Sequence, residues 1–131
     1  VQQLPGAEYA AREVCTDKNG ITGELVGAYP PIPGLTIYRR TLRVTEDGIT
    51  LRDETDYPGI VELTLLTEQK PVPIADGFAV GTLGGIRFDP DAATAAVTPV
   101  PITDPRLRTA WPETIYKITL HFQKTLNLEL Y

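Results

Sequence analysis

The chain of 131 residues contains no methionine, a single cysteine and a single histidine. Because a disulfide needs two thiols, Cys15 cannot form one within the chain, and one cysteine cannot build a cysteine-rich metal site. These counts exclude zinc fingers and most histidine-based catalysis. The missing initiator methionine predicts that the chain is a processed mature protein or a fragment of a longer one.

Positive charge is also scarce, with 12 lysines and arginines against 17 acidic residues and a net charge of -5. A nucleic-acid binder held by phosphates needs the opposite balance. The opening residues predict no signal peptide, and the sequence contains no apolar run near the roughly 20 residues of a membrane-spanning helix. Its length and its 42% hydrophobic residues predict one folded domain over residues 1–131. We therefore expect no nucleic-acid and no membrane partner.

Glycine and proline, in contrast, are abundant: they supply 23 of the 131 residues, about 18% against an average near 12%. Such frequent turn residues fit many short strands better than long helices. Five segments alternate apolar and polar residues with the period of two that is typical of a strand. They are 37–45, 49–52, 61–65, 116–122 and 126–130, and weaker strand candidates are 8–14, 21–28, 78–83, 86–88 and 93–100.

The alternation also predicts which side chains face the core. Arg40 interrupts the apolar face of the first segment, and Asn19-Gly20 and Glu46-Asp47-Gly48 have the composition of hairpin turns. Residues 92–96 suit a helix by propensity but are too few to form one alone. The pattern predicts an all-β fold, an antiparallel β-sandwich of roughly nine or ten short strands with little or no helix. The expected core residues are Leu42, Val44, Leu51, Val61, Leu63, Leu65, Ile118, Leu120, Phe122 and Leu128.

The only histidine, His121, is a candidate general base or metal ligand. It lies on the face of its predicted strand opposite Ile118 and Phe122, and no carboxylate stands at an obvious strand spacing from it. A solvent-facing side chain is therefore the favoured interpretation.

Two acidic clusters and one glycine-rich segment invite functional interpretations. Asp53, Glu54 and Asp56 suggest a calcium site, but their spacing fits no calcium loop, and a strand end that runs into a polar turn explains them more simply. Asp89-Pro90-Asp91 has the same interpretation. Residues 81–85 (GTLGG) lack the following helix that a phosphate cradle needs, so a tight hairpin is favoured.

Aromatic residues provide the candidate binding site. Trp111, Tyr29 and Tyr116 are candidate glycan contacts, and Tyr38 could complete a platform that stacks on sugar rings; the alternative is that these rings belong to the core. No residue of the chain is assigned a catalytic, cofactor-binding or metal-binding role, and no cofactor is expected in this chain.

Several stretches, in their order and spacing, resemble one known family. The chain opens with VQQLPGAEYAA at 1–11, continues with AYP at 28–30, YRR at 38–40 and ITLRDE at 49–54, and ends with DPRL at 104–107, Trp111 and IYKITL at 115–120. This series is similar to the C-terminal β-sandwich portion of heparinase II/III-like polysaccharide lyases, and the resemblance spans nearly the whole chain.

The resemblance implies a parent protein that pairs an N-terminal α/α toroid with a C-terminal antiparallel β-sandwich and cleaves uronic-acid-containing glycans by β-elimination. In that family a tyrosine and a histidine or asparagine move the protons, and some members hold a structural zinc. The family motifs that carry these roles would precede Val1, so none is assigned to a residue here. The implied partners are the toroid of the same parent chain and a polysaccharide. A periplasmic, secreted or cytoplasmic bacterial location would each fit one unpaired cysteine.

Two functions follow as expectations. The first is a non-catalytic C-terminal β-sandwich portion of such a lyase, which braces the toroid and lines part of the substrate cleft. The second is an independent carbohydrate-binding or adhesion module. The coding sequence upstream of Val1 would distinguish them, because helical repeats there favour the lyase.

Overall fold

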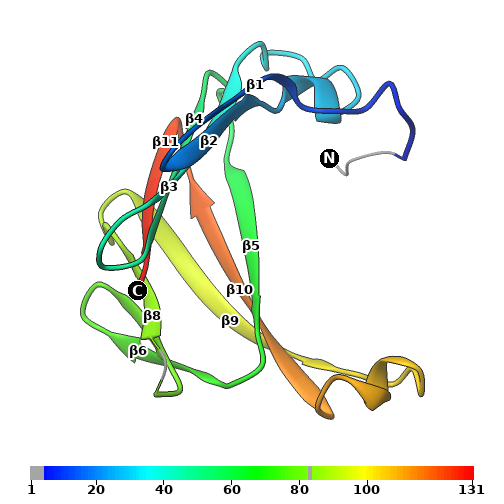
Figure 1. Cartoon of the computed structure of the whole chain (residues 1–131), viewed down its shortest axis with the longest axis vertical. Coiled ribbons are helices and arrows are strands. Elements are labelled where there is room, and N and C mark those ends of the chain that lie inside the picture. Colours follow the sequence, from blue (N-terminus) through cyan, green and yellow to red (C-terminus); the bar gives the residue numbers. More distant parts are fainter. Residues whose placement is uncertain (1–4, 83) are drawn as a thin grey trace.

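The computed structural model describes residues 5–82 and 84–131, which form β-strands joined by turns and loops (Figure 1). These residues contain eleven strands and two short 3-10 helices, η1 (Val26–Ala28) and η2 (Leu107–Thr109). The strands are β1 (Arg12–Asp17), β2 (Gly20–Glu24), β3 (Tyr38–Val44), β4 (Ile49–Thr55), β5 (Val61–Thr67), β6 (Pro71–Ile74), β7 (Gly77–Val80), β8 (Gly84–Phe88), β9 (Ala93–Pro101), β10 (Thr114–Phe122) and β11 (Thr125–Leu130).

The strands form two sheets in which the paired neighbours run antiparallel. Sheet A has eight strands in the order β1-β2-β3-β4-β11-β8-β7-β6, and sheet B has three in the order β5-β10-β9. Part of sheet A packs against sheet B and encloses the core. The predicted all-β antiparallel sandwich is therefore confirmed, with eleven strands in the described residues instead of nine or ten.

The core lies between sheet B and the strands β4, β11, β8 and β7 of sheet A. Ile118 and Leu120 on β10 are fully buried, because β10 is the middle strand of sheet B. Six predicted core residues are confirmed as buried, and three more are partly buried against them. The buried six are Leu51, Leu63, Ile118, Leu120, Phe122 and Leu128, and the partly buried three are Leu42, Val61 and Leu65.

The prediction that Val44 belongs to the core is wrong. Val44 is 64% exposed, and its partner across the β3–β4 hairpin, Ile49, is 40% exposed. Neither residue belongs to the core cluster, so this end of the hairpin extends beyond the cover that sheet B provides. Conversely, the fully buried Leu126 was missing from the predicted core.

Several predicted strand boundaries also need correction. β1 begins at Arg12 instead of Glu8, and β2 ends at Glu24 because residues 26–28 turn into η1. The predicted strand 78–83 ends at Val80, and Leu83 lies outside the described residues, as do Val1–Leu4 of the family-like opening. β6 was not predicted, because two of its four residues are proline, which is tolerated at the edge position that β6 occupies.

The predicted turn at Glu46-Asp47-Gly48 joins β3 to β4. The backbone amide of Thr45 donates a hydrogen bond to the carbonyl oxygen of Gly48 at 2.8 Å. Gly48 has φ of 148°, and a Cβ atom there would collide with the carbonyl oxygen of Leu130 on β11. Glycine is therefore required at this position by both conformation and space.

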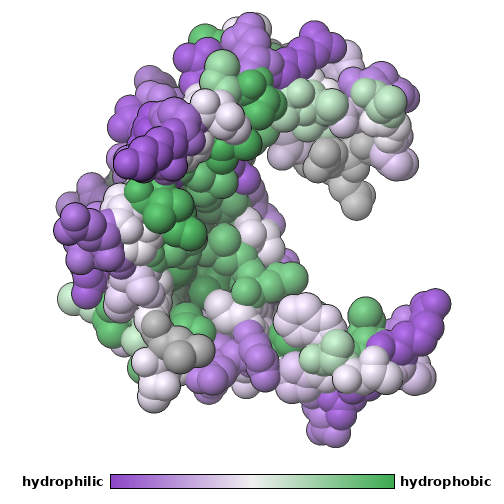
Figure 2. All heavy atoms as spheres, viewed as in Figure 1, coloured by the Kyte–Doolittle hydropathy of each residue, from purple (hydrophilic) through white to green (hydrophobic). Residues whose placement is uncertain are grey.

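Sheet A curves, so that the molecule has the outline of a letter C in projection (Figure 1). Sheet B lies inside the curve, β1 and β2 form one arm, and the β9–β10 connection that contains η2 forms the other. Apolar residues gather along the inside of the curve and hydrophilic ones on its outer side (Figure 2). Within the described ranges, no helix has the length and apolarity needed to cross a membrane.

Candidate functional site

A buried polar network explains why Arg40 interrupts the apolar face of β3. Asp53 on β4 is directly opposite Arg40 in the strand register and is completely buried. The Arg40 guanidinium donates through Nε to Asp53 Oδ1 at 2.7 Å and through Nη2 to Asp53 Oδ2 at 2.6 Å. The hydroxyl of Tyr38 also donates to Asp53 Oδ2, at 3.0 Å. Asp53 thus has the bidentate partner that a buried carboxylate requires.

This network holds its protons tightly. Burial raises the pKa of the Tyr38 hydroxyl, and the negative charge of Asp53 raises it further. The hydrogen bonds from Arg40 to Asp53 raise the pKa of the guanidinium. Both groups therefore keep their protons across the physiological range, which suits a structural role better than proton transfer.

A groove opens beside this network, between the segment that follows η1 and the strands β5 and β10. It has a volume of about 380 Å³, and the ring of Tyr29, stacked on Tyr38 with centroids 6.2 Å apart, forms part of its wall. Aliphatic side chains and a third tyrosine extend the wall, and polar groups of β4, β5 and β10 line the rest. These other lining residues are Ile32, Leu35, Thr55, Tyr57, Ile60, Val61, Glu62 and His121. A concave, largely apolar surface with a few polar groups has the character of a binding site.

The groove contains the one histidine, which has a carboxylate beside it. His121 on β10 is directly opposite Glu62 on β5, and its Nε2 lies 3.3 Å from Glu62 Oε2. No carboxylate stands at strand spacing from His121 in its own segment, and this partner comes from another strand 59 residues away. Both side chains are about half exposed, so the pair remains in contact with solvent.

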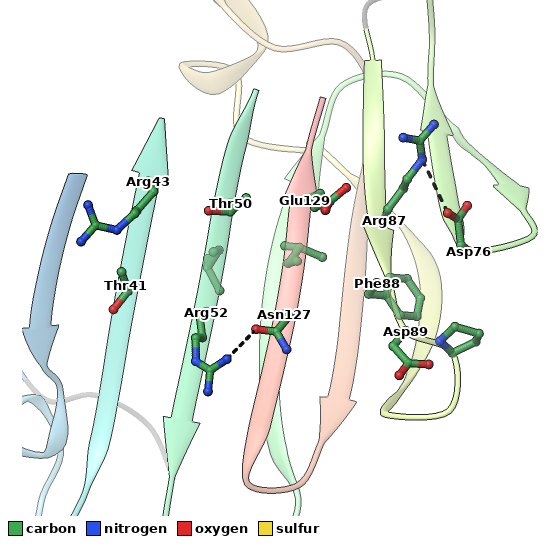
Figure 3. A pocket seen from close by; sticks show the side chains of 13 residues that line it. Thr41, Arg43, Thr50, Arg52, Asp76, Arg87, Phe88, Asp89, Asn127 and Glu129 are labelled. Carbon is green, nitrogen blue, oxygen red and sulfur yellow. Dashed lines mark hydrogen bonds and ion pairs between the residues drawn. The ribbon is translucent and has the colours of Figure 1, made fainter. Parts of the chain in front are cut away.

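A second hollow crosses the outer face of sheet A, with a volume of about 640 Å³ (Figure 3). Strand register places its polar side chains in two rows that run across the strands. One row is Arg43, Thr50, Glu129 and Arg87, from β3, β4, β11 and β8, and the other is Thr41, Arg52 and Asn127. We call this surface the outer trough.

The charges of the outer trough balance. Three arginines and three acidic residues line it, and each arginine makes an ion pair. Arg52 donates to Asn127 at 3.3 Å and pairs with Glu54 at 2.8 Å, whereas Arg87 pairs with Asp76 at 3.6 Å (Figure 3). The trough therefore offers many hydrogen-bond donors and acceptors without a net field for an anion.

The three candidate glycan contacts do not form one platform. Tyr29 follows η1 near the β1 end of the molecule, whereas Trp111 follows η2 in the arm at the opposite end (Figure 1). Trp111 is 45% exposed. Tyr116 is half-buried on β10, opposite Pro99 of β9. Among the described aromatic rings, Tyr29 stacks with Tyr38 and not with the other two candidates.

The predicted acidic cluster divides among three environments. Asp53 is buried with Arg40, which corrects the expectation of a simple strand end, and Glu54 pairs with Arg52 on the opposite face. Asp56 directly follows the end of β4, and its Oδ1 accepts the backbone amides of Thr36 and Ile37 at 2.9 Å. Across residues 5–82 and 84–131, no group of three or more His, Cys, Asp and Glu side chains is arranged to hold a metal ion.

The acidic segment Asp89-Pro90-Asp91 forms a turn, as predicted, whereas the glycine-rich segment includes Leu83, which lies outside the described residues. Asp89 Oδ1 accepts the backbone amide of Asp91 at 2.9 Å in the turn between β8 and β9. Val80 pairs with Gly84 where the glycine-rich segment joins β7 to β8.

No protein-family model matches this chain, and a comparison with curated proteins finds no match. The groove and the outer trough are therefore interpreted from their geometry and from the resemblance given by the sequence. Sequence reasoning missed Tyr57 and Glu62 of the groove and the two rows of the trough. For the trough a signal existed, since Thr41, Arg43, Thr50, Arg52, Asn127 and Glu129 all occupy polar positions of alternating segments.

Proposed function

We propose that this chain is the non-catalytic β-sandwich portion of a heparinase II/III-like polysaccharide lyase, a parent enzyme that acts on uronic-acid-containing glycans by β-elimination. In this proposal the concave side braces the α/α toroid of the same parent chain and lines part of the substrate cleft. The observation that carries the proposal is the groove, whose wall consists largely of aromatic and aliphatic side chains.

The composition of the groove wall supports docking against a helical domain. Ile60 is 64% exposed, and Tyr29, Ile32, Leu35 and Tyr57 are only partly buried, although they lie together. Large side chains that remain exposed in one patch mark an interaction surface. Apolar side chains projecting from the toroid's helices would fill this hollow and remove it from water.

The partners of the groove's histidine and of the Tyr38 hydroxyl support a bracing role. His121 in the groove wall is paired with Glu62, and the hydroxyl of Tyr38 is committed to Asp53. We therefore expect this chain alone to have no lyase activity. Incubation with heparin, heparan sulfate, alginate and chondroitin should give no rise in unsaturated-uronate absorbance, and a rise that depends on His121 would contradict the proposal.

The decisive experiment is to read the coding sequence adjoining this chain, express the helical segment found there and measure its binding. We expect binding, and we expect Ile60→Asp to weaken it about tenfold or more, because a charge would enter an apolar contact. Val44→Asp is the matched control, since Val44 is equally exposed at 64% but lies outside the groove. If no helical segment adjoins the chain, or the two variants bind alike, the bracing function is wrong.

The outer trough favours a second function, that of a carbohydrate-binding module. Its two rows place hydroxyl, amide, guanidinium and carboxylate groups on neighbouring strands, which lie about 4.8 Å apart. Balanced charge favours a neutral glycan over an acidic one. Affinity electrophoresis in neutral and acidic polysaccharides tests this: retention by a neutral glycan that Asn127→Ala reduces, and Thr64→Ala on sheet B does not, would support the module.

A further inference from the structure

The burial of one row of paired residues shows where sheet B stops covering the inner face of sheet A. Leu128, Leu51, Leu42, Ile21 and Thr16 are paired across β11, β4, β3, β2 and β1 and face the inside of the curve. Leu128 is 1% exposed, Leu51 6%, and Ile21 42%. The apolar face of sheet A thus continues past the strands that sheet B covers.

The uncovered inner face contains more than one apolar residue. Val14 on β1 is 52% exposed and lies next to Gly23 of β2, which is paired with Arg40 on this face. Together Val14 and Ile21 form an apolar strip on the arm made by β1 and β2. Figure 1 places this arm and β5 on the inside of the curve, and the space-filling view in Figure 2 shows the space between the two arms open in this projection.

Sheet B ends at the same place with a free edge. β5 pairs with β10 on one side, and among the described residues no strand pairs with Val61–Thr67 on the other. A row of unpaired N–H and C=O groups is a template for another strand. This edge can therefore bind an extended peptide through its backbone groups.

The other three edges are protected against pairing. β6 contains Pro71 and Pro73, and β9 contains Pro99 and Pro101. β1 has an irregular register between Arg12 and Cys15. Proline removes a donor and a register shift breaks the ladder, so these edges resist another strand. β5 contains no proline and pairs in unbroken register with β10.

We propose that the edge of β5 accepts a β-strand from outside the described chain, which extends sheet B beneath β2 and β1. The strand alternates apolar and polar residues, and its apolar side chains cover Ile21 and Val14 while its backbone pairs with β5. All eleven described strands already have places in the two sheets, so none of them supplies the added strand. This proposal does not rest on the lyase function.

A second copy of the chain is a poorer occupant than a single strand. The edge of β5 lies within the curve, between the two arms (Figure 1). A second copy would bring its own two arms toward this space together with its β5, whereas a single extended segment brings one strand alone.

The test uses a synthetic peptide with the sequence of β10, TIYKITLHF, as the probe, because β10 already pairs with β5 and has the required alternation. Its control contains proline in place of Lys117 and Thr119. We expect the full chain to bind the probe and not the control, as measured by fluorescence anisotropy. Hydrogen exchange should show new protection of β5 amides in the bound chain.

Variants of the chain then distinguish binding at this edge from nonspecific hydrophobic binding of the probe. Ile21→Asp should weaken probe binding about tenfold, because the charge removes an apolar contact. Val72→Asp on β6 is the control, since Val72 is similarly exposed at 58% at a different edge, and it should bind as the original chain does.

Four results would overturn the proposal. They are no probe binding, equal weakening by the two variants, new protection at β1, β6 or β9 instead of β5, and self-association that protects β5 without the probe. The last result would favour a second copy as the occupant. None of these results decides whether the helical segment binds at Ile60, because that binding is measured in a separate experiment.

Discussion

Sheet A contains two groups of strands that differ in what covers them. One group is β4, β11 and β8, and the other is β1 and β2. On the first group, inward-facing Leu51 and Leu128 are buried beneath sheet B. On the second, Val14 and Ile21 face inward in the same alternating pattern and are about half exposed. Alternation thus identifies the face of a strand that turns inward, whereas burial depends on whether another sheet lies opposite.

The largest expected effect is the loss of a core side chain in the covered region. Leu120→Ala should lower the free energy of unfolding by about 2–5 kcal/mol, because Leu120 is completely buried and its removal leaves a cavity. Denaturant unfolding measures the change. A loss below about 1 kcal/mol would contradict the tight packing between the sheets.

Breaking the buried network should have the next largest effect. Asp53→Ala leaves the Arg40 charge without its carboxylate, and we expect a loss of about 2–3 kcal/mol, at the lower end for buried pairs because the Arg40 side chain is 28% exposed. Paired replacement by Arg40→Met and Asp53→Leu is the control. The double variant should be more stable than Asp53→Ala, since no unpaired charge remains.

The inner face of β2, which sheet B does not cover, should tolerate the loss of a large side chain. Ile21→Ala should cost under about 1 kcal/mol, because Ile21 is 42% exposed. When the β10 peptide is bound, Ile21→Ala should lower the free energy of unfolding by more than it does in the free chain, if the added strand covers Ile21. A large loss in the free chain would show that β2 is covered without any partner.

Asp56 should give a smaller, pH-dependent contribution. Hydrogen bonds from the Thr36 hydroxyl and from the backbone amides of Ile37 and Thr36 hold the pKa of Asp56 below its ordinary value of 3.8. This contribution is present above pH 3.8 and is lost as the pH falls through the lower folded-state pKa. Asp56→Asn should therefore reduce the acid dependence of unfolding below pH 3.8, and an unchanged acid dependence would contradict the assignment.

The smallest effects are expected on the outer face of sheet B. Glu62→Ala and Lys117→Ala should each change the free energy of unfolding by under about 0.5 kcal/mol, because these side chains remain in contact with water. If their denaturation midpoints moved as far as that of Leu120→Ala, the assignment of the faces of β5 and β10 would be wrong.

Much of the fold could be predicted because strands leave a local signal. Residues 61–65, 116–122 and 126–130 alternate clearly, and each lies within an observed strand. β6 escaped prediction because prolines hide an edge strand, and 26–28 became a 3-10 turn in what the sequence presents as a continuous strand. Local propensity does not report whether a segment lies at the edge of a sheet.

The candidate sites were harder to predict, because their partners are distant in the sequence. Nothing near His121 indicates Glu62, and Arg40 has no visible reason to face inward until Asp53 is paired with it. Tyr29 was identified as a candidate contact, but Tyr57 and Ile60, which share its groove, were not. Side chains that meet across strands are selected by register, which no single segment encodes.

By itself, the sequence determined the strand periodicity, the turns at Asn19-Gly20 and Gly48 and the inward face of each long strand, because all of these depend on residues close together in the chain. Only the tertiary structure decided that Asp53 would neutralise Arg40, that Val44 would lie beyond the core and that β5 would end sheet B while sheet A continued. These outcomes depend on which strands become neighbours and where one sheet stops covering the other. That choice is made by the free energy of the whole assembly of strands, to which pairs far apart in the sequence contribute as much as adjacent ones.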